Sequence, residues 1–214
     1  MFFIIYRFIL NLIHYWPFNS DLNDIIGAKN LSYGSNCGLG SDRSGRANNA
    51  INLNTGYYNV PSGIYFNGDF TFSLWFNLRV LTNTPTFFEV ASVSLYNRVT
   101  FSFYNLLIIV GFEDGNKALL LNCYTSTQTV SLNTWTHTTI VYSNLKVQIY
   151  VNSIEQSVTC SANVNKLPSN VIRSVNFIGR TSYYSTRPDI QADLDEIKIY
   201  NKGLSLDEVQ ADYF

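Results

Sequence analysis

Residues 69 to 78 read Asp-Phe-Thr-Phe-Ser-Leu-Trp-Phe-Asn-Leu, and this stretch decides the fold class. Every second residue in it is apolar: Phe70, Phe72, Leu74, Phe76 and Leu78. Because successive side chains of a β-strand point to opposite faces, these five side chains share one face of a strand. Trp75 stands on the other face, so we expect that face to be partly covered as well. The stretch therefore predicts a strand whose apolar face lies in a core.

The sequence on either side continues as short apolar runs separated by Gly, Asn, Pro and Ser. Further strands are predicted at 99–104, 106–112, 118–124, 135–142, 145–151, 173–178 and 194–200. One short helix is predicted near the C-terminus, because Ser205-Leu-Asp-Glu208 has the form of a capping box. The chain therefore reads as an all-β domain of roughly a dozen strands with one C-terminal helix.

Composition narrows the class of protein. The 214 residues carry a net charge of −1, 14% of them are charged and 15% are aromatic. Such a chain has enough apolar surface to fold, and its low charge content is unlike that of a coiled coil. No basic stripe is present to neutralise phosphates, so a nucleic-acid partner is not expected. We expect one domain of this length to bury a sizeable core.

Several segments, in order along the chain, resemble one family. They are His14-Tyr-Trp-Pro-Phe-Asn19, Asp24-Ile-Ile-Gly27, Phe70-Thr-Phe-Ser-Leu-Trp75, Thr134-Trp-Thr-His137, Val147-Gln-Ile-Tyr-Val-Asn152 and Asp195-Glu-Ile-Lys-Ile-Tyr200. Together they make residues 14–214 similar to the laminin-G-like, concanavalin A-like domains, in the branch related to pentraxins. The resemblance implies a jelly-roll sandwich of two curved antiparallel sheets. One departure is Ser153, which stands where the family usually has a hairpin Gly.

The first 13 residues, MFFIIYRFILNLI, are almost wholly apolar. They are too few to span a membrane, so no membrane insertion is expected. No basic residue precedes the apolar run and no small-x-small cleavage site follows it. Two interpretations stay open: a degenerate signal segment, or an extended first strand that leads into the domain at 14–214. We expect the chain to be part of a multidomain protein.

The chain has three cysteines, Cys37, Cys123 and Cys160. Three pairings are possible, and the sequence does not select among them. Cys123, which lies in the predicted strand at 118–124, and Cys160 are the disulfide candidates. A disulfide would fit an oxidising, extracellular compartment.

The resemblance also implies a structural calcium ion. In the family, calcium often sits where the opening Asp-x-x-Gly turn meets the Asp that precedes the closing strand. Those positions are Asp24 and Asp195 here, with Asp21 and Asn23 nearby in the first loop. The alternative is that Asp24 binds its own backbone in a turn and that Asp195 is a solvated strand end.

Catalysis is not expected from the sequence. A retaining glycosidase needs two carboxyl groups close together on one face of the sheet. Asp195-Glu196 and Glu113-Asp114 are adjacent residues, so their side chains point to opposite faces, and Glu89 stands alone in its strand. We interpret His137, beside Trp135 in a predicted strand, as a structural histidine.

The candidate ligand-binding loop is Arg180-Thr-Ser-Tyr-Tyr-Ser-Thr-Arg187. Arg180, Tyr183, Tyr184 and Arg187 are side chains of the kind enriched at recognition sites. The alternative is that one tyrosine belongs to the core while the other covers a sheet edge.

These observations predict a non-catalytic, extracellular or cell-surface recognition and adhesion module. It would bind carbohydrate or protein through its loops or through a concave sheet face. Two alternatives stay open: a glycan-active enzyme of the same fold, and a structural repeat of a larger adhesive protein.

Overall fold

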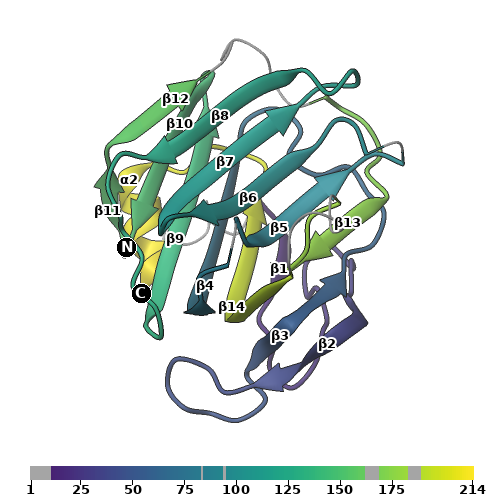
Figure 1. The fold of residues 1–214 in the computed structure, drawn as a ribbon, viewed down its shortest axis with the longest axis vertical. Coiled ribbons are helices and arrows are strands. Elements are labelled where there is room, and N and C mark those ends of the chain that lie inside the picture. Colours follow the sequence, from purple (N-terminus) through teal and green to yellow (C-terminus); the bar gives the residue numbers. More distant parts are fainter. Residues whose placement is uncertain (1–10, 83, 94, 162–168, 183–188) are drawn as a thin grey trace.

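The computed structural model describes residues 11–82, 84–93, 95–161, 169–182 and 189–214. These residues form fourteen strands and one helix (Figure 1). The strands are β1 (Leu12–Trp16), β2 (Ser32–Gly40), β3 (Ala50–Asn59), β4 (Phe70–Val80), β5 (Thr86–Ala91), β6 (Val99–Tyr104), β7 (Leu107–Glu113), β8 (Leu119–Thr125), β9 (Trp135–Ser143), β10 (Lys146–Val151), β11 (Ile154–Gln156), β12 (Val158–Ser161), β13 (Val175–Ile178) and β14 (Ile190–Tyr200). The helix is α2 (Leu206–Tyr213). Leu12 and Ile13, the last two residues of the apolar N-terminal segment, belong to β1.

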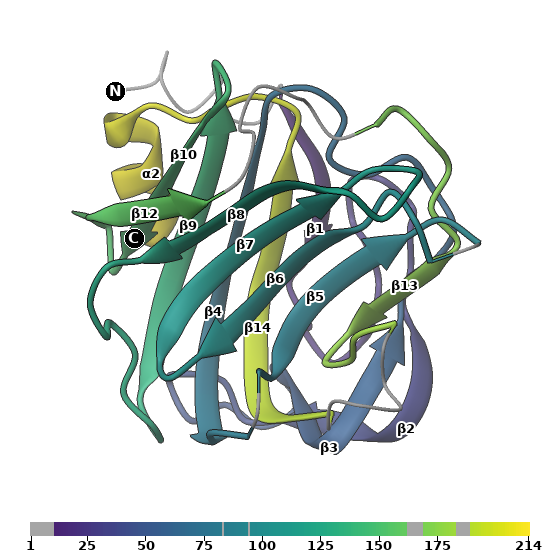
Figure 2. The ribbon, with the colours of Figure 1, turned by 45° about the horizontal axis from the view of Figure 1, so that its top comes forward.

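The strands pair antiparallel along one continuous path, β11-β10-β9-β4-β14-β3-β13-β5-β6-β7-β8-β12, with β1 added on β14 and β2 on β3. The prediction of an antiparallel all-β fold with one C-terminal helix is therefore confirmed. Two separate sheets are not confirmed, because β3 joins the halves: its residues 51–56 pair with β14 and its residues 58–59 with β13. The path curls until β12 lies beside β10, so the sheet is nearly closed (Figures 1 and 2).

An aromatic core fills the curled sheet. The alternating apolar side chains of β4 are buried, as the sequence predicts. The Phe72 ring lies 4.4 Å from that of Phe101, and the Phe76 ring lies 5.0 Å from that of Phe103. Thus β4 faces β6 across the core although the two strands are far apart along the hydrogen-bonded path (Figure 2). Alternate residues of β4 and β6 consequently point to opposite outer surfaces.

Helix α2 begins at the predicted capping box. The Glu208 N–H donates to Ser205 Oγ at 3.4 Å, and the Ser205 N–H donates to Glu208 Oε2 at 2.9 Å. The helix covers part of β4, where the Tyr213 ring stacks on Trp75 at 5.3 Å. Within the described residues, no helix has the length and apolar composition needed to cross a bilayer.

Two local features bear on stability. The structure joins Cys123 in β8 to Cys160 in β12 by a disulfide bond, and Cys37 is a free thiol. The hairpin between β10 and β11 turns through Asn152 and Ser153, whose φ angles are 48° and 63°. Ser153 therefore adopts the left-handed conformation in which a glycine carries no steric penalty.

Candidate functional site

Asp24 is the hydrogen-bond centre of the first loop. Its Oδ1 accepts the N–H groups of Tyr15, Ile26 and Gly27 at 2.9–3.1 Å. Its Oδ2 accepts the Lys29 N–H at 3.1 Å and lies 2.7 Å from His14 Nδ1. Burial alone would raise the pKa of Asp24, but these hydrogen bonds, His14 foremost, lower that pKa to about 2.

Asp195 lies in a separate polar group. Its Oδ2 accepts from Arg43 Nη1 at 3.1 Å and its Oδ1 from the Glu196 N–H at 2.8 Å. Burial, followed by the negative charge of Glu196, raises the pKa of Asp195 to about 7, against the opposing charge of Arg43. Asp21, in turn, accepts from both the backbone and the side chain of Asn23.

These contacts do not fit a calcium ion. Both oxygens of Asp24 are already occupied by N–H donors, which supply the positive charge density that a cation would. No hydrogen bond between described residues joins Asp24 to Asp195. Among the described residues, no group of three or more His, Cys, Asp or Glu side chains is arranged to hold a metal. The calcium ion stays a prediction, and the turn interpretation accounts for the observed contacts of Asp24.

The candidate loop at 180–187 is described only in part, since Tyr183, Tyr184 and Arg187 lie outside the described residues. Arg180 makes internal contacts. Its guanidinium forms a two-point ion pair with Asp189 and lies 3.5 Å from the centre of the Tyr57 ring. This side chain therefore ties the loop to β3.

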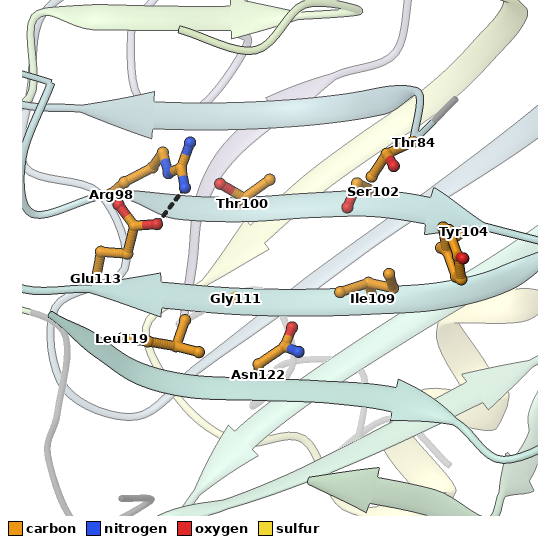
Figure 3. Close-up of a pocket in the computed structure, with 10 residues that line it drawn as sticks. All are labelled: Thr84, Arg98, Thr100, Ser102, Tyr104, Ile109, Gly111, Glu113, Leu119 and Asn122. Atoms are coloured by element: carbon orange, nitrogen blue, oxygen red, sulfur yellow. Dashed lines mark hydrogen bonds and ion pairs between the residues drawn. The ribbon is translucent and has the colours of Figure 1, made fainter. Parts of the chain in front are cut away.

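A hollow of about 340 Å³ lies on the outer surface of β6, β7 and β8 (Figure 3). Its position follows from register: Thr100 in β6 is opposite Gly111 in β7, which is opposite Asn122 in β8. Gly111 has no side chain, and it lies between its two polar neighbours. A Cβ atom there would meet only Leu121 O, at 3.9 Å, so the space above Gly111 is open.

The two ends of the hollow differ in chemistry. At one end Arg98 forms an ion pair with Glu113, and at the other stands the half-exposed ring of Tyr104 (Figure 3). Glu113 Oε2 is buried and has no hydrogen-bond partner among the described residues. The hollow therefore combines a buried acceptor that has no partner with hydroxyl and amide groups and an aromatic ring. The complete lining is Thr84, Arg98, Thr100, Ser102, Tyr104, Ile109, Gly111, Glu113, Leu119 and Asn122.

Glu89 of β5 lies opposite Thr100, beside this hollow, and it is fully buried. Its Oε2 accepts from the hydroxyls of Thr100 and Thr181, both at 2.9 Å, and its Oε1 accepts the Ser182 N–H at 2.5 Å. Arg98 Nη1 is 3.8 Å from Glu89 Oε2. Glu89 thus ties Thr100 of β6 to the start of the 180–187 loop at Thr181 and Ser182, and its oxygens are not available to a ligand.

Sequence reasoning did not single out this hollow. Part of the signal was present, because Arg98, Thr100, Ser102 and Tyr104 are polar residues at every second position of one strand. The contributions of Gly111, Glu113 and Asn122 depend on strand register, which the sequence does not show. His137, by contrast, is buried between Trp75 and Tyr213, as a structural histidine would be.

Comparison with solved structures shows the same fold in binding domains. The binding domain of Paraclostridial Mosquitocidal Protein 1 has 18% identity and a TM-score of 0.70, over 96% of this chain and 52% of that chain. The ligand binding domain of botulinum neurotoxin serotype D, solved with N-acetylneuraminic acid, has 16% identity and a TM-score of 0.70, over 95% and 50%. This chain thus spans about half of either toxin chain.

A third similar structure is matched over almost its whole length. It is Domain 4 of AbnA, a GH43 extracellular arabinanase from Geobacillus stearothermophilus, in complex with arabinotriose. Its identity is 18% and its TM-score 0.73, over 95% of this chain and 98% of that chain. No curated protein sequence gives a significant match.

The sequence itself matches a family model. A laminin G model, described as the Concanavalin A-like lectin/glucanases superfamily, covers residues 52–210. That span includes β4, with its alternating apolar residues, and all the strands of the hollow. The chain belongs to the Concanavalin A-like lectin/glucanases superfamily.

Proposed function

We propose that this chain is a non-catalytic recognition module that binds carbohydrate in the hollow over β6, β7 and β8. The observation that carries the proposal is the open floor at Gly111, which is flanked by Thr100 and Asn122. A sugar ring resting there would have hydroxyl and amide groups on two sides. Saccharide recognition requires this combination of a recess and several fixed polar groups.

The charges favour a neutral sugar. Arg98 and Glu113 neutralise each other, and the buried Glu89 adds negative charge close to Arg98. An anionic sugar would therefore meet no net positive charge. The unpartnered Glu113 Oε2 is instead suited to accept a hydrogen bond from a sugar hydroxyl.

The same residues argue against hydrolysis. A glycosidase needs two carboxyl groups that both reach the glycosidic bond. Among the residues that line the hollow, Glu113 is the one carboxylate, and Glu89 is held below the surface by three donors. The hollow is thus a place to hold a sugar rather than to cleave one.

Two of the similar structures contain saccharide ligands, arabinotriose and N-acetylneuraminic acid, which supports carbohydrate as the ligand class. An extracellular or cell-surface location is part of the proposal. It is supported by the Cys123–Cys160 disulfide, which persists in oxidising compartments, and by the arabinanase being extracellular. The match to about half of each toxin chain supports a multidomain parent protein.

The test is a glycan array probed with the wild type, Gly111→Leu and Gly38→Leu. A Cβ atom at 111 would meet only Leu121 O at 3.9 Å, so leucine there places its side chain in the hollow; leucine at 38 makes the same change on β2, where a Cβ atom has nothing within 4 Å. We expect saccharide binding by the wild type and by Gly38→Leu, and its loss in Gly111→Leu. Runs in calcium and in chelator show whether a cation contributes.

Other outcomes favour the alternatives. Binding that survives Gly111→Leu would refute the hollow as the site. Absence of binding to any glycan would favour a protein ligand or a structural repeat. Cleavage of an arrayed glycan, abolished by Glu113→Gln, would identify an enzyme.

A further inference from the structure

A row of polar side chains crosses the outer surface on the other side of the molecule. Strand register places Trp135 of β9 opposite Asn77 of β4, Asn77 opposite Asp193 of β14, and Asp193 opposite Asn52 of β3. The row spans three gaps between neighbouring strands of about 4.8 Å each, or about 14 Å. It is long enough to contact a short oligosaccharide.

This row and the hollow lie on opposite surfaces. The side chains of Phe72 and Phe76 point from β4 into the core, where they meet Phe101 and Phe103 of β6. Asn77 alternates with the β4 phenylalanines, as Thr100 and Ser102 alternate with those of β6. The full thickness of the aromatic core therefore separates the two polar surfaces.

Hydrogen bonds hold the row in place. Asp193 Oδ1 accepts from Asn52 Nδ2 at 2.6 Å, and its Oδ2 accepts from Asn77 Nδ2 at 3.3 Å. Arg79 forms an ion pair with Asp193 and donates through Nη2 to Leu53 O at 2.6 Å. The groups are thus fixed before any ligand arrives, which reduces the entropy lost on binding.

The row nevertheless contains an acceptor without a partner and two partly exposed side chains. Asn77 Oδ1 is buried and has no hydrogen-bond partner among the described residues, so it is an acceptor without a donor. The Arg79 side chain is 26% exposed, and Trp135 is partly exposed at the end of the row. Ser41, Asp42 and Asn54 complete the shallow depression around these groups.

We propose that this row is a second carbohydrate site, so that one domain can hold two glycan chains on opposite surfaces. The Trp135 ring provides an apolar plane for the face of a sugar, and the amides and guanidinium provide donors and acceptors for its hydroxyls. Arg79 pairs with Asp193, and Asp42 pairs with Arg46, so the charges cancel, which favours a neutral sugar. The row shares no residue with the hollow, so it is tested separately, but the binding of two glycan chains by one domain also rests on the proposed function of the hollow.

The indole N–H of Trp135 provides a direct test. The chain has three tryptophans, and Trp16 donates its indole N–H to Lys29 O at 2.8 Å inside the protein, so its resonance is an internal control. Protein labelled with ¹⁵N is titrated with maltotriose, cellotriose and xylotriose at millimolar concentrations. We expect the Trp135 indole resonance to shift and saturate with at least one of them, while the Trp16 resonance stays in place.

Two matched variants separate the surfaces. Asn77→Leu removes the unpartnered acceptor of the row, and Asn122→Leu makes the same change in the hollow. Asn77→Leu should raise the Kd obtained from the Trp135 titration by tenfold or more, which corresponds to about 1.4 kcal/mol. Asn122→Leu should leave this Kd unchanged. An unchanged Trp16 resonance shows that each variant is folded.

Three results would overturn the proposal: no Trp135 shift with any of the trisaccharides in the wild type, an undiminished shift in Asn77→Leu, or loss of the shift in Asn122→Leu. The wild-type titration decides the first without any variant. Failure of the hollow appears separately, as glycan-array binding that survives Gly111→Leu.

Discussion

Asp24→Asn is expected to lower the free energy of unfolding by about 3 kcal/mol. An asparagine keeps one side-chain oxygen. If that oxygen retains the three N–H groups now on Oδ1, the new amide group faces the Lys29 N–H and His14 where Oδ2 accepted them. His14 can change tautomer and accept a hydrogen bond from the new amide group. The backbone N–H of Lys29 cannot, so it loses its charge-assisted hydrogen bond and faces another donor.

The lowered pKa of Asp24 gives a similar value for this loss of stability. Asp24 has a pKa of about 2 in the folded protein, against about 3.9 in an unfolded chain. Two pKa units correspond to about 2.5 kcal/mol of stabilisation by the ionised form. Because the folded pKa is the lower one, this stability is present above about pH 4 and is lost as the pH falls through about 2.

The assay is thermal unfolding, followed by tryptophan fluorescence, in calcium and again in chelator. For a domain of this size, about 3 kcal/mol corresponds to a decrease in Tm of about 6–12 °C. We expect the same decrease in both buffers, because the donors around Asp24 are N–H groups of the chain itself.

Asp21→Asn is the matched control, since Asp21 is exposed in the same loop and bonds only to Asn23 among the described residues. It should change stability by less than about 0.5 kcal/mol. A decrease for Asp24→Asn that occurs only in calcium, or an equal decrease for Asp21→Asn, would refute this reasoning and favour a calcium ion in the loop.

Three further outcomes are expected. Cys160→Ser opens a disulfide with a sequence separation of 37 residues and should cost up to about 4 kcal/mol by urea denaturation, a loss that a reductant should reproduce in the wild type. Ser153→Gly should stabilise the hairpin by about 0.5–1 kcal/mol, because it removes a left-handed non-glycine residue; a lower Tm would contradict this. Burial lowers the pKa of His137 to about 4, below about 6.5 in the unfolded chain, so protonation of the unfolded state destabilises the protein as the pH falls between these values. The stability of the wild type relative to His137→Gln should therefore fall by about 3 kcal/mol between about pH 7 and about pH 4; the raised pKa of Asp195 acts in the opposite direction but is common to both proteins.

Local patterns were enough to predict most secondary structure. The run at 99–104 was predicted with the bounds that β6 has, and the capping box at Ser205 opens the only helix of the described residues. Both signals are local, because side-chain alternation and capping involve residues at most a few positions apart. Pairing into one continuous path was not predictable in this way, since it depends on β3 contacting both β13 and β14.

The candidate sites likewise combine features that local sequence predicts with contacts that depend on the fold. The sequence placed Asp24 in a turn motif, as a calcium ligand or as a turn residue that binds its own backbone, but its donors come from residues 14 to 29, whose arrangement depends on the folded loop. Glu89 looked isolated in the sequence, yet the fold places Thr100, Thr181 and Ser182 around it. Residues far apart in the chain meet only where strand register brings them together.

The sequence by itself therefore determined eight of the fourteen strands of the described residues, the buried face of β4, the helix start and the family. The tertiary structure alone decided which outward-facing residues share a surface: Arg98 with Glu113 in the hollow, and Trp135 with Asn77 and Asp193 on the opposite side. The physical reason is that alternation along a strand is set by backbone geometry, whereas neighbours across strands are set by register and by the curl of the sheet around its aromatic core.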